Sequence, residues 1–284
     1  MIDALLVPFQ FEFGRQALVV ASLVAATCAV LSCFLVLRGW ALLGDAISHG
    51  VLPGIVLAYV LGLPLLLGAF AAGLFCSFAT GYLAEHSRVK EDTVMGIVFS
   101  GMFAAGLVLH TSIRADVHLD QILFGNILGL EADDIWRTTS IAALTLATIV
   151  ALRRDLLLWS FDETHARAAG LRVTWLRYGF LALLSLAIVG AMEAVGIILV
   201  IALLIAPGAT AFLVADRFAT MLALSVLVAV ASAVSGVLVS FAIDAATAPT
   251  IVLALTAFFL AAFIFSPKRG LFAARRARRR AVTS

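Results

Sequence analysis

The feature that most constrains this chain is a set of long segments without a charged side chain. Residues 17–37 form one such run, and residues 50–84 form another that is too long for a single membrane crossing. A helix that crosses a bilayer needs about 20 mostly apolar residues. Hydrophobic residues make up 63% of the chain and charged residues 13%, whereas a soluble domain is about half apolar and about a quarter charged. The chain must therefore be embedded in lipid, which excludes a soluble enzyme, a nucleic-acid-binding protein and a disordered scaffold.

These runs predict an all-α, polytopic transmembrane bundle of about nine spans, with eight possible. Gly62 and Pro64 interrupt the run at 50–84, so two spans are expected there. The fifth span is the weakest of the set. The predicted spans are 17–37, 41–61, 64–84, 93–113, 136–152, 178–192, 196–213, 218–243 and 245–265.

The distribution of basic residues predicts the orientation. Of the 19 Lys and Arg residues, all but Arg15, Arg114 and Arg137 fall on one side of this arrangement. Such an excess marks the cytoplasmic side, so the C-terminus is expected inside the cell. No basic region followed by a cleavage site opens the chain, and no removable signal peptide is predicted. The expected parts are an extracytoplasmic segment at 1–16, a transmembrane domain at 17–266 and a basic cytoplasmic tail at 267–284.

The segment GWALLGDAISHGVLPG, residues 39–54, places two ionisable residues inside a predicted span. Asp45 and His49 are four residues apart and therefore share one helix face. Ionisable groups within a membrane usually face a cavity, a partner or a transport path, and Asp and His are ordinary ligands of first-row metals. A hydrogen bond that only orders the bundle is the alternative. Small residues and a proline accompany the pair, suited to close packing and to a kink: Gly44, Ser48, Gly50 and Pro53.

Two further segments carry candidate polar groups. Asp116, His118 and Asp120 alternate in a predicted outer loop, where an extended backbone would direct all three to one side. Such a loop could capture a metal, bind a partner protein or simply be solvated. Pro207 and Gly208 predict a broken or bent seventh span, either a transport feature or a simple kink.

The longest polar stretch, residues 153–177, contains FDETHARAAGL, which predicts a short helix. Asp162 and Glu163 suit its positive N-terminal end, and Gly170 suits its C-terminal cap. The helix could be a solvated connection or a docking element for another protein. The cysteines make no CxxC pair and none is near Asp45 in the sequence: Cys28, Cys33 and Cys76.

Three segments resemble one protein family. GWALLGDAISHGVLPGIVLAYVLG, from residue 39, resembles the hallmark of the zinc/manganese/iron group of ABC-transporter permeases. VGIILVIALLIAPGATA, residues 195–211, is similar to the second hallmark of that family. DVHLDQILFGNILG, residues 116–129, is similar to the branch that carries manganese and iron. Together these segments extend the resemblance over most of residues 15–265.

The resemblance implies a dimeric permease in a bacterial cytoplasmic (inner) membrane. Its implied partners are a second permease copy or close homologue, a separate cytoplasmic ATPase and an extracytoplasmic metal-binding substrate protein. Asp45 and His49 would contact the transported ion, which is manganese, iron or zinc, and no cofactor would be bound permanently. Asp162, Glu163 and Gly170 would belong to the ATPase-coupling region, and Asp116, His118 and Asp120 would serve metal entry or docking of the substrate protein.

Rival functions receive less support from the sequence. A zinc permease of the same family is the main alternative, since Asp and His ligands do not separate these metals. An ATP-independent metal transporter is a weaker one. An intramembrane enzyme would need a second polar cluster beside Asp45 and His49. The sequence contains no GxxxxGK[ST], HExxH or GxSxG motif, so ATP hydrolysis is expected on another chain.

Overall fold

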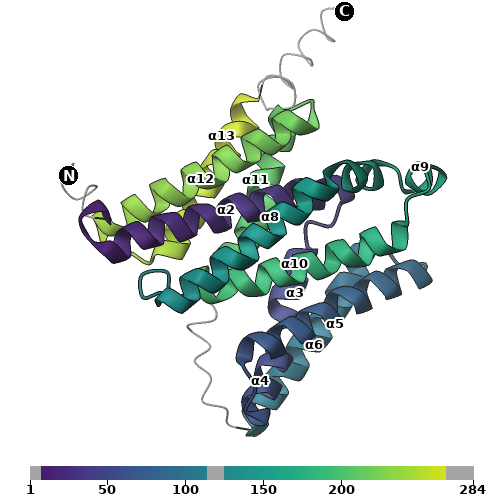
Figure 1. The fold of residues 1–284 in the computed structure, drawn as a ribbon, viewed down its shortest axis with the longest axis horizontal. Helices are drawn as coiled ribbons and strands as arrows, with labels where there is room; N and C mark the ends of the chain where they lie inside the picture. Colours follow the sequence, from purple (N-terminus) through teal and green to yellow (C-terminus); the bar gives the residue numbers. More distant parts are fainter. Residues whose placement is uncertain (1–7, 114–124, 267–284) are drawn as a thin grey trace, which may run out of the picture. The chain divides into compact units, whose positions relative to one another are not determined.

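The computed structural model describes residues 8–113 and 125–266, and the elements it defines there are α-helices. Among these residues, eight segments are long and apolar enough to cross a membrane. Figure 1 shows the helices in chain order. The predicted all-α transmembrane class is confirmed. Some predicted features lie outside the described residues: Asp116, His118, Asp120 and the tail at 267–284.

The helices have the following bounds: α2 Glu12–Arg38, α3 Leu43–Gly50, α4 Leu52–Leu61, α5 Leu65–His86, α6 Glu91–Ile113, α8 Ala132–Phe161, α9 Glu163–Ala168, α10 Val173–Val195, α11 Ile197–Val214, α12 Phe218–Ile243 and α13 Thr247–Phe265.

The chain divides into two compact units. Unit 1 comprises residues 1–36, 127–130 and 202–284, and unit 2 comprises residues 37–126 and 131–201. Unit 1 thus contains most of α2 and α11 together with α12 and α13. Unit 2 contains α3 to α10 and every polar cluster discussed below.

Hydroxyl groups and aromatic rings join the helices of unit 1. α12 lies along α13, as Figure 1 shows. The Ser225 hydroxyl of α12 donates to the carbonyl of Ala29 in α2 at 3.0 Å, and the rings of Phe34 and Phe218 lie 5.1 Å apart. Buried hydroxyls that find backbone acceptors avoid the cost of an unpaired polar group in an apolar medium.

α11 continues through Pro207, so the predicted break in this helix does not occur. The Ser32 hydroxyl of α2 accepts the Gly208 amide hydrogen bond at 3.0 Å and donates to the Ile205 carbonyl at 3.3 Å. A Cβ at Gly208 would overlap that hydroxyl. Proline removes an intrahelical donor, and neighbouring helices can compensate for such losses within a membrane. Ser32 contacts the backbone on both sides of Pro207, at Ile205 and Gly208.

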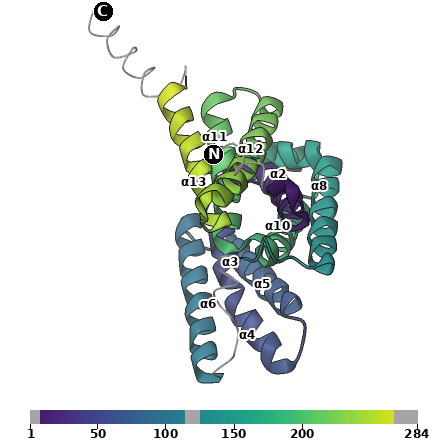
Figure 2. The same cartoon turned by 90° about the vertical axis from the view of Figure 1, so that its left-hand side faces the viewer.

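Glycines bring the helices of unit 2 close together. At the crossing of α4 and α5, a Cβ added at Gly54 would overlap the Gly68 carbonyl, and the reverse also holds. The Ser185 hydroxyl of α10 donates to the Gly73 carbonyl of α5 at 3.2 Å. α10 also packs on α8, where the Thr138 hydroxyl donates to the Gly190 carbonyl at 3.3 Å. Figure 2 shows α3, α4, α5 and α6 as neighbours within this unit.

Several predicted boundaries required correction. The predicted span at 41–61 is confirmed as one apolar segment, Leu43–Leu61, but it consists of two helices, α3 and α4, that meet at Val51. α8 continues to Phe161, so the polar stretch at 153–177 is not a loop from its start. The longest uncharged run within α8 is residues 138–152, which is shorter than the about 20 residues that a span needs. α8 is not among the eight apolar segments, and its crossing of the membrane stays a prediction.

Candidate functional site

The Asp45 and His49 side chains are paired on α3. His49 Nε2 lies 3.4 Å from Asp45 Oδ1, and the two side chains are 27% and 35% exposed, respectively. The helical spacing of four residues produces this contact, as the sequence predicts. The separation is long for a charge-assisted hydrogen bond, so each group keeps capacity for another partner.

Two phenylalanines of α6 flank the imidazole. The ring centroids of Phe99 and Phe103 each lie 5.5 Å from that of His49. These residues are one helical turn apart, so α6 presents both rings to the same imidazole. They limit the rotamers that His49 can adopt. Nothing in the sequence alone links this pair to His49; its spacing of four residues on a predicted span is the one local signal.

The opposite face of α3 is packed in the protein interior. Ala46, Ile47 and Ser48 are at most 3% exposed, and the Ser48 hydroxyl donates to the carbonyl of Gly44 at 2.7 Å. The small side chains of Ala46 and Ser48 therefore pack in the protein interior, in agreement with the close packing that the sequence predicts. They let α3 seat deeply while Asp45 and His49 remain partly open.

A cysteine distant in sequence also contacts α3. The Cys76 thiol of α5 donates to the carbonyl of Ala46 at 3.4 Å, and a Cβ at Gly50 would lie 2.8 Å from its sulfur. Cys76 is thus a packing residue on the buried face. Across residues 8–113 and 125–266, no cluster of three or more His, Cys, Asp or Glu side chains is arranged to hold a metal. Within these described residues, Asp45 and His49 form a pair of side chains of the types that bind metals.

The predicted helix in FDETHARAAGL is confirmed as α9. The Asp162 carboxylate accepts the backbone N–H of His165 at 2.9 Å and caps the N-terminus. At the other end Gly170 has a φ of 82°, and the Leu171 amide donates to the Ala166 carbonyl at 3.1 Å. This is the Schellman motif, in which the residue with the left-handed backbone conformation is usually glycine.

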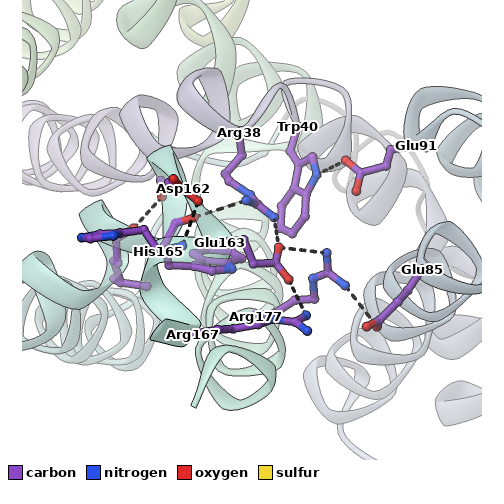
Figure 3. Close-up of polar contacts among 12 residues, drawn as sticks. Arg38, Trp40, Glu85, Glu91, Asp162, Glu163, His165, Arg167 and Arg177 are labelled. Carbon is purple, nitrogen blue, oxygen red and sulfur yellow. Dashed lines mark hydrogen bonds and ion pairs between the residues drawn. The ribbon is translucent and has the colours of Figure 1, made fainter. Parts of the chain in front are cut away.

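Glu163, in the first turn of α9, is the centre of an ion-pair network (Figure 3). Its carboxylate lies 3.2 Å from Arg38 Nη2, 2.8 Å from Arg167 Nη2 and 3.6 Å from Arg177 Nη2. Partial burial by itself raises the pKa of Glu163, but the three guanidinium groups outweigh it and hold that pKa below the usual range of a glutamate. Glu163, 25% exposed, is therefore largely engaged in contacts within the protein.

The remaining ionisable residues form separate local contacts. Glu193 is exposed at the end of α10, with Asp134 and Arg137 of α8 near enough to act on it electrostatically. Asp244 adopts a φ of 52° and ends α12. The His86 ring nitrogen contacts the Tyr82 carbonyl at 2.9 Å. None of these joins Asp45 and His49 in a cluster that could hold a metal.

The sequence matches the family described as ABC 3 transport family over residues 10–266. The chelated iron transport system membrane protein YfeD of Yersinia pestis is 55% identical over 91% of this chain and 87% of its own length. The manganese transport system membrane protein MntB of Synechocystis is 48% identical over 94% of this chain and 87% of its own length.

Solved structures show the same fold. PsaBC from Streptococcus pneumoniae, solved in complex with Fab, has a chain that superposes with a TM-score of 0.85 and 37% identity, covering 97% of this chain and 100% of that one. A second structure, described as an inward-facing conformation of a metal-chelate type ABC transporter, superposes with a TM-score of 0.70 and 18% identity. It covers 88% of this chain and 85% of its own chain, and this similarity concerns the fold alone. By the family match and these identities, the chain belongs to the ABC 3 transport family.

Proposed function

We propose that this chain is the membrane-embedded permease subunit of an ATP-driven importer of Mn²⁺ or Fe²⁺. The observation that carries the proposal is the Asp45–His49 pair, partly exposed on a short helix within an otherwise apolar segment. Oxygen and imidazole nitrogen ligands suit divalent first-row metals. Relatives named for iron and manganese transport support this cargo, and Zn²⁺ is the rival cargo.

Two ligands from one chain favour a transient site that two copies complete. Around a twofold axis, a dimer would offer two carboxylates and two imidazoles to one ion. A transport site must bind its ion strongly enough to admit it and weakly enough to release it. A second permease copy or a close homologue is therefore the proposed partner within the membrane.

ATP hydrolysis is proposed to occur on a separate cytoplasmic subunit that contacts α9. The sequence contains no P-loop motif. α9 offers an exposed face that includes Thr164, His165 and Ala168, while Ala166 is buried beneath it. A short capped helix held against the bundle is suited to receive force from a partner. An extracytoplasmic metal-binding protein is the proposed donor of the ion.

The side of the membrane on which α9 lies is proposed from the basic residues. An excess of Lys and Arg marks the cytoplasmic side, which places α9 and the C-terminus in the cytoplasm of a bacterial inner-membrane protein. A reporter that is active only in the periplasm, fused after Ser284, should therefore be inactive. Reporter activity would reverse the proposed orientation.

The function is tested by initial uptake of radioactive Mn²⁺, Fe²⁺ and Zn²⁺, normalised to assembled complex. Asp45→Asn keeps the size of the side chain but removes its charge, and we expect uptake to fall to the level of cells without the gene. Ser48→Ala is the matched control on the buried face of α3 and should retain uptake. Near-normal uptake by Asp45→Asn refutes the site, and uptake of Zn²⁺ alone assigns the cargo to the rival metal.

A further inference from the structure

The ion pairs around Glu163 extend beyond α9 to other helices of unit 2. Arg177 of α10 also pairs with Glu85 of α5, with 3.1 Å between Nη1 and Oε2. Arg38 Nη1 donates to the Trp159 carbonyl near the end of α8 at 3.3 Å. Figure 3 shows Arg38 and Arg177 directed toward the Glu163 carboxylate, with Glu85 on the other side of Arg177. A helix of six residues is thereby joined to α5, α8 and α10 and to residue 38.

The two arginines that hold Glu163 are largely removed from solvent. The side chains of Arg38 and Arg177 are 13% and 11% exposed, whereas that of Arg167 is 60% exposed. Removing one partner of a desolvated ion pair leaves an uncompensated charge and is costly. The contacts with Arg38 and Arg177 are therefore the strong ones, and the Arg167 contact, within α9 itself, is a surface pair.

A second set of contacts extends from Arg38 to α3. The Arg38 guanidinium lies over the Trp159 ring at 4.4 Å and over the Trp40 ring at 5.0 Å. The Trp40 indole N–H donates to the Glu91 carboxylate in the first turn of α6. The Trp40 carbonyl accepts the Leu43 amide at 3.0 Å, at the start of α3. Asp45 lies two residues further along the chain.

Contacts thus run without interruption from α9 to the helix that carries Asp45 and His49. Trp40 is 3% exposed and Trp159 is fully buried. A displacement of Arg38 must therefore move these rings, because they are packed against protein rather than solvent. Close-packed interiors transmit such displacements because they deform little. The buried Nε atoms of Arg38 and Arg177 have no hydrogen-bond partner within the described residues. Each arginine thus has a donor with which to form a new hydrogen bond if the helices move.

We infer that Glu163 and Arg38 are positioning residues that transmit movement of α9 through Trp40 to α3, and so set the geometry of Asp45 and His49 during ATP-driven transport. This inference rests on the proposed function, in which a separate ATPase acts on α9. The alternative role for the same contacts is static: they would hold α9 in place and influence only the amount of folded protein. The two roles differ in the number of ions moved for each ATP hydrolysed.

The test uses the complete transporter, with its ATPase and metal-binding protein, reconstituted in liposomes. ATP hydrolysis and Mn²⁺ uptake are measured in the same vesicles, and their ratio is compared among variants. Glu163→Gln should keep most of the ATP hydrolysis but lower the ratio about tenfold, within the ~5–150-fold range typical of coupling between sites. Arg172→Gln alters an exposed arginine that lies outside α9, and should leave the ratio unchanged.

A second variant covers the case in which Glu163→Gln fails to accumulate. Arg38→Lys keeps the charge but loses the planar fork that contacts Glu163, the Trp159 carbonyl and both indole rings, and should lower the ratio in the same way. In the double variant the two losses should not add, because both interrupt one link. A wild-type ratio in assembled Arg38→Lys complexes, or fully additive losses, would overturn the link.

Failure of this link is distinguishable from failure of the proposed function. If α9 does not contact the ATPase, the charge that Gly170→Asp introduces at the end of α9 will leave copurification of the ATPase unchanged. If only the link is wrong, copurification will respond to that charge while the transport ratio of Arg38→Lys remains normal.

Discussion

The carboxylates of Asp45 and Glu163 differ in the number of cationic side chains around them. Asp45 has one imidazole neighbour at 3.4 Å, whereas Glu163 has three guanidinium neighbours within 3.6 Å. A carboxylate surrounded by arginines is fixed in charge and place, and has little capacity left for a cation. A carboxylate beside one histidine keeps most of its acceptor capacity. The difference separates a group available to cargo from a group committed to the architecture.

The largest expected effect is at the available pair. His49→Ala removes a ligand and should abolish metal uptake, while Asp45→Glu keeps the charge with displaced geometry and should retain partial uptake. Initial uptake for each assembled complex is the measurement. If His49→Ala complexes carry metal at the wild-type rate, the contrast between an available and a committed carboxylate no longer describes this protein.

A large effect on assembly is expected at the end of α9. Gly170 has a left-handed backbone and no atom within 4 Å of an added Cβ, so space is not limiting there. Gly170→Asp places a negative charge at the negative end of the helix and should reduce copurification of the ATPase. Gly170→Asn tolerates the same backbone conformation without the charge and is the matched control. Equal copurification of the two variants would show that charge at this position is irrelevant.

A moderate effect on stability is expected within the network. Arg177→Gln leaves Glu163 and Glu85 without a shared partner. We expect a loss of about 2 kcal/mol, below the ~3–5 kcal/mol for a fully buried pair, because Glu85 is 41% exposed and screened by water. Thermal unfolding of the purified protein in detergent measures this loss. Arg172→Gln alters an exposed arginine near the same end of α10 and should change the midpoint little.

The sequence predicted those elements whose signals are local. The bounds of α12 agree with the predicted span because Arg217 and Asp244 flank an uninterrupted apolar run. The α9 helix and its glycine cap follow from residues within one short segment. The contact between Asp45 and His49 needed only helical spacing. Periodicity and capping act over a few residues, so they are visible in the chain before it folds.

The sequence did not reveal features that depend on distant residues. Arg153 and Arg154 predict the start of a loop, but α8 continues to Phe161, because charges end an apolar span without ending a helix. The network was missed because its members are separated by up to 139 positions, as Arg38 and Arg177 show. Each of them alone resembles a solvated charge at a span end. Only the packing of α5, α8 and α10 brings them to Glu163.

The smallest expected effect concerns pH. Arginine neighbours lower the pKa of Glu163 below its usual range, so its ion pairs contribute their full stability above the pKa of a glutamate in the unfolded chain. That contribution is lost as the pH falls through the lowered pKa. The difference in unfolding midpoint between wild type and Glu163→Gln should therefore be constant from about pH 8 to about pH 6, where glutamates are ionised, and should narrow in acid. A difference that narrows near neutral pH would mean that Glu163 is not held by its arginines.

The contact between Ser32 and Gly208 has an evolutionary consequence. The Ser32 hydroxyl accepts a hydrogen bond from the Gly208 amide and donates one to the Ile205 carbonyl. Any side chain at position 208 would overlap that hydroxyl. An alanine at position 32 would leave an orphaned amide beside Pro207, and an alanine at position 208 would expel the serine. Selection therefore acts on the two positions jointly, and we expect them to covary among relatives although 175 residues lie between them in the chain.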